Sequence, residues 1–216
     1  MKAELEAVTR SVRNPLMSIQ NLVAYFARVS NETGSHRPDE ELIKYLLKND
    51  HVSPFDMCHV VLRVETSRDI ARQFLRHRSF AFQEFSQRYS ATETYADLRE
   101  ARLQDYKNRQ NSLETDDKEL KKWWSQAQLT VSEQAFGLYD VALKKGIAKE
   151  QARALLPEGL TNSRLFVSGS IRSWIFYTKV RTHPTTQKEH RELALACATE
   201  VEKVFPMIKE FINDES

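Results

Sequence analysis

The spacing of apolar residues along the chain changes between the two-residue period of strands and the three-to-four-residue period of helices. Alternating apolar and polar positions at 58–65 predict a half-buried strand, with His59 on its more polar side. Runs rich in β-branched and aromatic residues predict further strands at 18–30 and 164–168. These three segments are expected to form the sheet of the fold.

Helical spacing covers more of the chain than strand spacing does. The predicted helices lie at residues 38–48, 68–76, 148–156, 171–181 and 187–205. The polar segment 91–111 is expected to be mostly helical, with the charges of Arg99 and Arg102 in solvent. Gly169 and Ser170 are expected to form a turn that caps the helix at 171–181.

One predicted helix is much longer than the others. It is capped by residues 115–117, reaches Lys145 and is stopped by Gly146. Apolar residues at intervals of three and four form a stripe along it: Leu120, Trp124, Ala127, Val131, Ala135, Leu138 and Ala142. We interpret this stripe as core or as a subunit interface.

No repeat or low-complexity linker divides the chain, and 216 residues suffice for one substantial core. We therefore expect a single α+β domain over residues 1–216. Its mainly antiparallel sheet would be flanked by helices, among them the long helix and a C-terminal helix.

The charge balance excludes a bulk electrostatic attraction to nucleic acid or to an anionic membrane. The chain has 32 basic and 30 acidic side chains, which gives a formal net charge of +2. No apolar run approaches the roughly 20 residues of a membrane span. The first residues, MKAELEAVTR, contain no apolar signal core, so a cytoplasmic location is expected. Cys58 and Cys197 stand in apolar surroundings and are expected to be buried, reduced thiols.

Several common kinds of site are not indicated. The six histidines include no close pair next to a carboxylate cluster, so no metal site is predicted. Only five glycines are present, and they form neither a P-loop nor a dinucleotide-binding fingerprint. Between Lys48 and Lys107 the chain has eight arginines and no lysine, a bias that favours planar, bidentate contacts to anions.

The stretch from Arg76 to Ser90, RHRSFAFQEFSQRYS, concentrates this chemistry. Three arginines and a histidine alternate with three phenylalanines, a combination that suits a groove for a planar, negatively charged ligand. Arg76-His77-Arg78 is followed after seven residues by Ser86, and Arg88 comes two residues later. This spacing resembles the signature of the flavin-dependent thymidylate synthases.

Flanking motifs extend the resemblance over most of the chain. The matching stretches are Ala27–Ser30, His51–Asp56, Arg153 ahead of Leu156-Pro157, Gly169–Trp174, and Arg181 nine residues after Arg172. Three departures are also present: Ser170 replaces an asparagine, Phe176 replaces an asparagine or histidine, and Thr185-Thr186 replaces a His-Ala pair.

The resemblance implies a reaction as well as a fold. Enzymes of this family convert dUMP to dTMP by reductive methylation, without an enzyme cysteine as nucleophile. The carbon comes from 5,10-methylenetetrahydrofolate and the hydride from FAD that NADPH has reduced. The family also implies a homotetramer whose active sites are shared between subunits, with no membrane or nucleic-acid partner.

The resemblance also assigns residues to roles. Those expected to bind the nucleotide are Gln73, Arg76, Glu84, Ser86, Gln87, Arg88, Arg153 and Arg181. Those expected to bind the flavin are Ser30, Ser53, Arg76, His77, Arg78, Glu84, Ser170 and Arg172. Arg181 is the expected catalytic residue, because it would stabilise negative charge on the uracil ring.

Alternative functional interpretations of the same residues remain open. A nucleotide- or RNA-binding module could use these arginines and phenylalanines, since single strands are bound by stacking and by arginine. Ser86 with His77 as base could form a nucleophilic pair, although no nucleophile-elbow glycines surround it. An all-helical interaction protein would explain the long helix but not the arginine spacing.

Overall fold

The computed structural model describes residues 1–30, 37–91 and 96–213. Its main sheet is antiparallel and has the strand order β1-β2-β6-β3. The strands are β1 (Lys2–Val8), β2 (His59–Ser67), β6 (Asn162–Ser170) and β3 (Ala81–Glu84). The prediction of an α+β fold with a mainly antiparallel sheet is confirmed.

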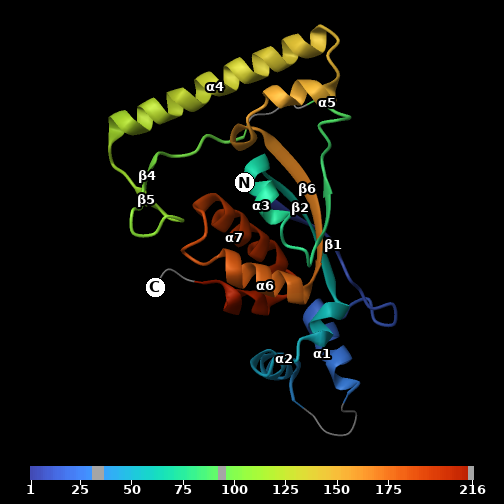
Figure 1. The fold of residues 1–216 in the computed structure, drawn as a ribbon. Helices are drawn as coiled ribbons and strands as arrows, with labels where there is room; N and C mark the ends of the chain where they lie inside the picture. Colours follow the sequence, from blue (N-terminus) through green and yellow to red (C-terminus); the bar gives the residue numbers. More distant parts are fainter. Residues whose placement is uncertain (31–36, 92–95, 214–216) are drawn as a thin grey trace.

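Helices cover one face of this sheet (Figure 1). They are α3 (Arg68–Phe74), α6 (Ile171–Arg181), α7 (Lys188–Glu202) and the 3₁₀ helix η4 (Pro206–Phe211). Alternate residues of β2 and β6 point into this layer, where Val64, Leu165 and Val167 are fully buried beside the rings of Phe74 and Trp174. The apolar side chains that alternate along the strands therefore pack against the apolar sides of the helices in one core.

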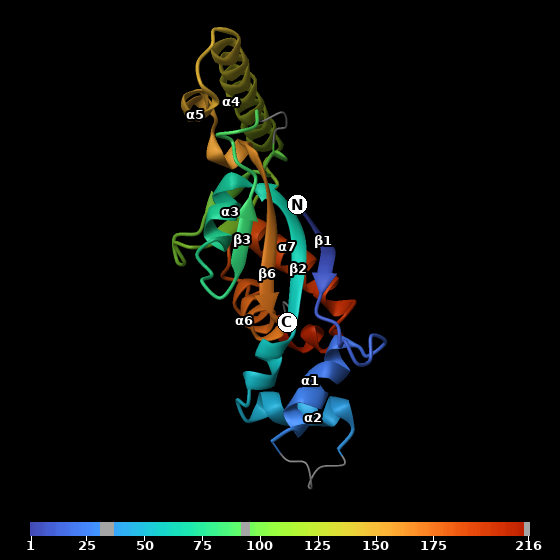
Figure 2. The same cartoon turned by 90° about the vertical axis from the view of Figure 1, so that its right-hand side faces the viewer.

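The opposite face of the sheet has no helix over it in the described part of the chain, as Figure 2 shows. Its side chains are the other half of the strand alternation. Arg63 on β2 pairs with Glu65 at 2.5 Å and with Glu4 on β1 at 3.5 Å. Phe166, which faces Arg63 and Gln83 across the sheet, remains 42% exposed. We call this surface the open face.

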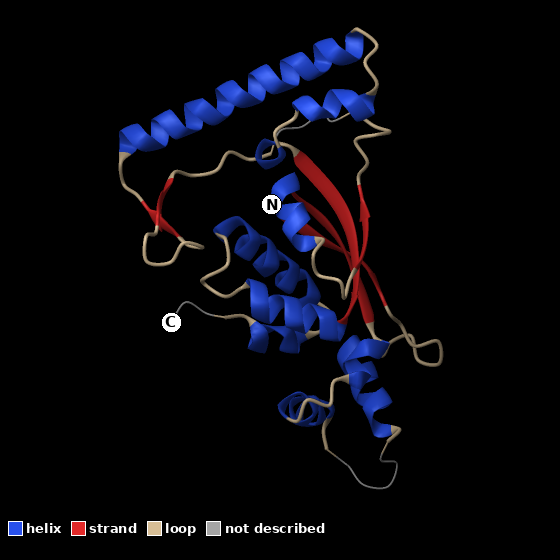
Figure 3. Cartoon of the chain, viewed as in Figure 1, coloured by secondary structure: helices blue, strands red, loops and turns tan. Residues whose placement is uncertain are grey.

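Further helices extend beyond the two ends of the sheet (Figure 3). At one end lie α1 (Ile19–Arg28), α2 (Asp39–Lys48) and η1 (Ser53–Met57). At the other end lie α4 (Lys118–Lys144), α5 (Lys149–Ala152), η2 (Arg153–Leu155) and η3 (Glu158–Leu160). A two-stranded sheet of β4 (Arg102–Gln104) and β5 (Ser112–Glu114) precedes α4.

The strand predicted at 18–30 is wrong, because this segment forms helix α1. Ile19, Leu22 and Val23 are buried at helical spacing, and the Ser18 hydroxyl accepts a hydrogen bond from the Asn21 backbone N–H at 3.1 Å. The β-branched and aromatic residues of this segment favour a strand only in isolation. Burial of one side of the segment against the core decides the outcome instead.

The helix predicted within 91–111 is also wrong where the structure describes it. Residues 96–101 form an extended loop that leads into β4. Arg99 pairs with Asp69 at 2.6 Å, and Arg102 pairs with Glu189. The prediction that both arginines lie in solvent is wrong, because each neutralises a carboxylate on a helix of the main layer. Four short strands, at Lys2–Val8, Ala81–Glu84, Arg102–Gln104 and Ser112–Glu114, were not predicted from the sequence.

Helix α4 confirms the prediction of a long helix. The Asp117 carboxylate accepts a hydrogen bond from the Leu120 N–H at 3.0 Å, and Gly146 follows with φ of 84°. The predicted apolar stripe is not the buried face, however. The buried residues are Gln128, Ser132, Phe136 and Tyr139. The Gln128 carboxamide both accepts from the Arg99 N–H and donates to the Arg99 carbonyl, so the helix packs on the loop through a polar side chain.

The turn predicted at 169–170 is absent, since β6 runs directly into α6. Ser170 is the last residue of β6 and the N-cap of α6, and its hydroxyl accepts from the Ser173 N–H at 3.2 Å. Gly169 belongs to the strand and lies against Phe80. A Cβ atom at position 169 would lie 2.4 Å from two Phe80 ring carbons.

We expect Gly169→Ala to lower the free energy of unfolding by about 1–3 kcal/mol, because the new methyl group would displace the Phe80 ring, which is buried against Phe74 and Trp174. Denaturant unfolding measures this change. The matched control is Gly137→Ala on α4, where nothing lies within 4 Å and the substitution removes an unfavourable helical glycine. A Gly169→Ala variant as stable as the control would contradict this packing.

Candidate active site

The Arg-His-Arg segment leaves α3 between two buried rings. Phe74 ends the helix, and Phe80 is buried against it with ring centroids 5.7 Å apart. Between them, the His77 N–H donates to the Phe74 carbonyl, and the Phe80 N–H donates to the His77 carbonyl. The two rings fix the direction of the turn, so that His77 is half-buried while Arg76 and Arg78 are exposed.

This turn forms one wall of a hollow of about 510 Å³. The hollow is lined by Asp56, Arg76, His77, Arg78, Ser79, Arg172, Ser173 and Phe176. Arg172 donates to Asp56 at 3.0 Å, and Phe176 is 58% exposed. Three guanidinium groups against one carboxylate make the hollow electropositive, and an accessible ring gives it a flat surface. We call it the arginine hollow.

His77 also contacts the end of α6. The Arg181 Nε–H donates to His77 Nε2 at 2.8 Å. Burial, together with the positive charges of Arg181 and Arg76, lowers the pKa of His77 to about 4. The imidazole is therefore neutral near pH 7 and can accept this hydrogen bond from a guanidinium that is always charged.

Two glutamines and a second histidine lie behind this pair. Gln73 Nε2 donates to Gln187 Oε1 at 2.7 Å, and His190 Nδ1 lies 3.1 Å from Gln73 Oε1. His190 is fully buried, its Nε2 has no partner, and burial lowers its pKa to about 3. We call His77, Arg181, Gln73, Gln187 and His190 the central cluster.

The remaining predicted nucleotide residues gather elsewhere, near α5. They are Glu84, Ser86, Gln87, Arg88 and Arg153, which we call the upper cluster. Ser86 Oγ accepts from the Arg88 N–H at 3.4 Å. Arg88 Nε lies 4.0 Å from the Glu150 carboxylate, and Arg153 Nε donates to the Glu150 carbonyl at 3.3 Å. The two arginines thus meet at one residue of α5.

In the upper cluster, Glu84 is held by hydrogen bonds and Gln87 is buried. Glu84 accepts from Ser163 Oγ at 2.7 Å and from Arg68 Nη1 at 3.3 Å. Gln87 is 3% exposed and its Nε2 has no partner. A buried amide without a partner is costly, so this donor is suited to a ligand or a further chain.

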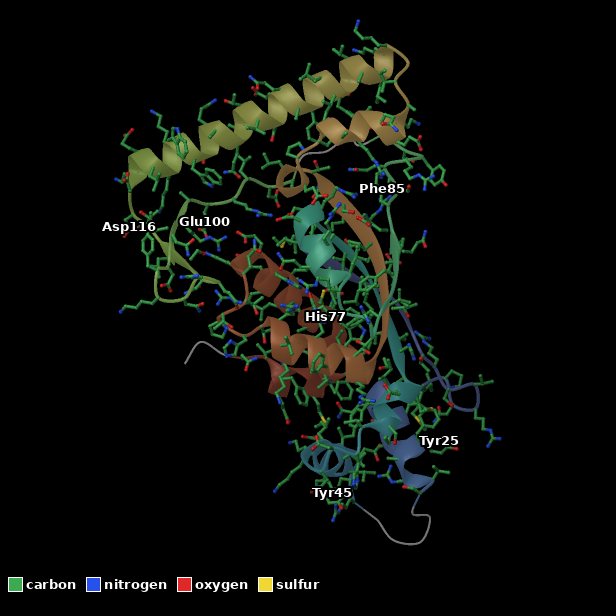
Figure 4. All side chains as sticks on the ribbon, in the orientation of Figure 1. Tyr25, Tyr45, His77, Phe85, Glu100 and Asp116 are labelled. Carbon is green, nitrogen blue, oxygen red and sulfur yellow. The ribbon has the colours of Figure 1, made fainter. Side chains whose placement is uncertain are left out.

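The chain alone does not unite the two clusters. Figure 4 places His77 beside α6 and α7, whereas Phe85 lies close to α5. Among the described residues, no hydrogen bond or ion pair links the central cluster to the upper cluster. The residues predicted to bind one nucleotide therefore lie in two separate places.

Four predicted flavin residues do not line the arginine hollow. One of them, Glu84, belongs to the upper cluster. Ser30 is exposed at the end of α1, where its hydroxyl donates to the Ala27 carbonyl. Ser53 is exposed and is the first residue of η1, whose N-cap is Val52. Ser170 is buried and donates to Asp56 Oδ1 at 2.9 Å, so it contacts the hollow only through that carboxylate.

Several residues of the site, among them Asp56, Gln187 and His190, were not assigned from the sequence. Asp56 stands within the His51–Asp56 motif, so its position offered a signal. His190 offered none, because its contact with Gln73 joins residues 117 apart in the chain. Thr185, which belongs to the pair that replaces the family's His-Ala, lies in the loop after α6. Its hydroxyl contacts His183 Nδ1 at 2.8 Å.

The thiols do not offer a nucleophile. Cys58 and Cys197 are both free and buried, as predicted. Burial raises the pKa of Cys58 to about 11 and raises that of Cys197 further. In the described ranges, no group of three or more His, Cys, Asp and Glu side chains could hold a metal ion. No helix there has the length and apolarity needed to cross a membrane.

An electropositive hollow beside an Arg–His pair, in a chain whose thiols are buried, suits a planar anionic ligand. Residues 16–207 match the family described as thymidylate synthase complementing protein. The chain is 49% identical over 192 residues to a flavin-dependent thymidylate synthase from Synechocystis sp., covering 89% of this chain and 88% of the relative. It is 43% identical to a probable flavin-dependent thymidylate synthase from Paramecium bursaria Chlorella virus 1, covering 99% of both.

Solved structures agree with this assignment. A UMP/dUMP methylase, PolB from Streptomyces cacaoi, bound with 5-Br UMP, superimposes with a TM-score of 0.81 at 25% identity, covering 97% of this chain and 92% of that one. The chain therefore belongs to the thymidylate synthase complementing protein family, the flavin-dependent thymidylate synthases.

Proposed function

We propose that this enzyme converts dUMP to dTMP by reductive methylation. The carbon would come from 5,10-methylenetetrahydrofolate and the reducing equivalents from NADPH by way of bound FAD. The observation that carries the proposal is the arginine hollow next to the hydrogen bond between neutral His77 and charged Arg181, in a protein whose two thiols are buried and hard to ionise. A site of this kind binds and polarises its ligands rather than attacking them.

The arginine hollow has the chemistry for part of the flavin. Arg76 and Arg78 are exposed and have no ion pair among the described residues, so their guanidinium groups are available to phosphate oxygens. Phe176 offers a ring face where relatives carry a hydrogen-bonding residue, and we assign it to stacking. When bound, reduced flavin supplies the hydride. Arg172 and Asp56 would fix the wall against which it lies.

The nucleotide is assigned to both clusters. Ser86, Arg88 and Arg153 of the upper cluster would hold the phosphate, because the two guanidinium groups meet at Glu150 and the Ser86 hydroxyl contacts the Arg88 backbone. Gln73 and Arg181 of the central cluster would face the base. The Arg181 guanidinium cannot accept a proton, but it can stabilise negative charge that develops on the uracil ring.

Because the clusters are apart within one chain, we propose that each complete site is built by two subunits of a homotetramer. The open face supports self-association: it carries both signs of charge around the exposed ring of Phe166, and no helix covers it in the part of the chain that the structure describes. Nucleic acid is not an expected partner. The alternative of an RNA-binding module finds no support among the relatives named above.

The proposed reaction is tested with purified protein, FAD, NADPH, methylenetetrahydrofolate and dUMP. The expected results are flavin binding by absorbance, NADPH oxidation and formation of dTMP by chromatography. Folded protein that neither binds added FAD nor forms dTMP would overturn the proposal. Tight binding of single-stranded RNA by the same protein would favour the alternative.

The shared site predicts complementation between two inactive variants. Arg88→Ala alters the upper cluster and Arg181→Ala the central cluster, and each should be nearly inactive alone. If a site takes one cluster from each of two subunits, co-expressed variants form some sites in which both clusters are intact, and dTMP formation should partly return. Separately purified variants mixed without subunit exchange are the control. Assembled mixed oligomers that stay inactive would place both clusters in one subunit's site.

A further inference from the structure

We propose that His77 is a positioning residue for Arg181: its neutral ring accepts the Arg181 Nε–H and thereby aims the rest of the guanidinium at the nucleotide base. This inference rests on the proposed function. It gives His77 a role different from the flavin contact that the family resemblance implies.

The first support is the geometry of the pair. The hydrogen bond of 2.8 Å uses Nε, the one guanidinium nitrogen whose direction is fixed by the side chain itself. Arg181 makes no other hydrogen bond or ion pair within the described residues, so all four Nη–H donors remain for a ligand. One bond at Nε therefore sets the plane of the guanidinium without consuming the donors that face the substrate.

The second support is the way in which His77 itself is held. Its ring meets the Tyr177 ring edge-on at 5.1 Å and 86°, and the Phe74 ring at 6.2 Å and 82°. Phe74 and Tyr177 are stacked on each other at 4.4 Å and both are fully buried. An acceptor on such a support has little freedom to rotate, so it transmits the rigidity of the core to Arg181.

The third support is the electrostatic setting of the ring. The charged groups that act on it, Arg76 and Arg181, are both cations, and His190 behind it is buried and neutral near pH 7. A carboxylate in this place would form a tighter ion pair with Arg181 and would reduce the positive charge offered to the ligand. A neutral acceptor orients the guanidinium and leaves its charge for the uracil ring.

His77 is also the one described residue that lines the arginine hollow and hydrogen-bonds Arg181. The same ring thus lies between the place assigned to flavin and the group assigned to the base. A misplaced guanidinium would slow the step that needs the nucleotide, and a displacement of about 1 Å can cost up to about a hundredfold in rate.

The test compares His77→Leu, which removes the acceptor, with His77→Gln, whose carboxamide oxygen can still accept. His77→Leu should slow nucleotide-dependent reoxidation of reduced flavin by tenfold to about a hundredfold, with FAD affinity and NADPH oxidation retained. His77→Gln should restore part of the rate. His59→Leu, at an exposed ring on β2, is the matched control and should behave as wild type.

A double-mutant cycle separates positioning from an independent flavin contact. If His77 acts through Arg181, the double variant His77→Leu/Arg181→Ala should be no slower than Arg181→Ala alone. Multiplicative losses, or a loss of FAD affinity in His77→Leu and His77→Gln alike, would overturn the inference and return His77 to the flavin.

A final measurement does not depend on activity. In the wild-type chain labelled with ¹⁵N-histidine, the His77 signals at pH 7 should be those of a neutral ring with the proton on Nδ1, and Arg181→Ala should shift the Nε2 signal. An imidazolium, or a proton on Nε2, would overturn the inference even in an enzyme that makes dTMP. Conversely, these signals would stand if the proposed reaction proved wrong.

Discussion

Arg181→Ala should lower the rate of dTMP formation by about a hundredfold to a thousandfold. The guanidinium is half-buried at the end of α6, where it is shielded from bulk water and oriented by His77. Charge stabilisation is strongest for a preorganised donor in such a setting, and losing one typically costs about 2.7–4 kcal/mol of barrier. Arg181→Lys keeps the charge but loses the planar fork and the Nε–H, so it should recover only a small part of the rate.

Stopped-flow measurement of the two half-reactions locates the defect. Reduction of bound FAD by NADPH should survive in both variants, whereas reoxidation in the presence of folate and dUMP should be slow. Lys179→Ala, an exposed cation on the same helix, is the control and should leave both half-reactions near wild type. Slow flavin reduction together with normal reoxidation would assign Arg181 to the other half-reaction.

The second large effect is a loss of stability in acid caused by His190. The folded-state pKa of His190 is about 3, against about 6.5 for a histidine in an unfolded chain. Between these values the unfolded chain binds a proton that the folded protein does not. The contribution of His190 is therefore constant above about pH 6.5 and falls as the pH is lowered, by about 1.4 kcal/mol for each pH unit inside the window.

Urea unfolding at a series of pH values measures this slope. His190→Gln should lower the slope between pH 6 and pH 4 by about 1.4 kcal/mol per unit relative to wild type, whatever its effect on stability at pH 7. The slope that remains would include His77, whose pKa is lowered to about 4. Equal slopes for wild type and His190→Gln would show that His190 is protonated in the folded protein.

The elements predicted correctly are those in which local pattern and tertiary burial agree. The alternation at 58–65 and the helix at 171–181 appear where expected, because each segment buries the side that its own periodicity defines. The predictions for residues 18–30 and for the described part of 91–111 are wrong for the opposite reason. Propensity favoured a strand in the first and a helix in the second, whereas packing of Leu22 and the pairing of Arg99 with Asp69 decided their structures.

The candidate site also combines features that local sequence determines with features that tertiary packing determines. Local patterns singled out Arg76–Arg78, Arg172 and Arg181, and the structure places these residues in the arginine hollow and the central cluster. That they bind flavin and nucleotide stays a prediction. The hydrogen bond between His77 and Arg181 joins residues 104 apart in the chain, so no local pattern reveals it. The separation of the upper cluster from the central cluster is a tertiary property as well.

The uninterrupted passage from β6 to α6 links the two surfaces on which the proposed enzyme depends. The strand presents Phe166 to the open face, and five residues later the same backbone begins the helix that carries Arg172 and Arg181. No loop stands between them to absorb a displacement. A subunit that binds to the open face would therefore contact the same continuous backbone that carries both arginines. Substitutions on the open face that weaken oligomer formation should also disturb the orientation of these arginines and lower activity.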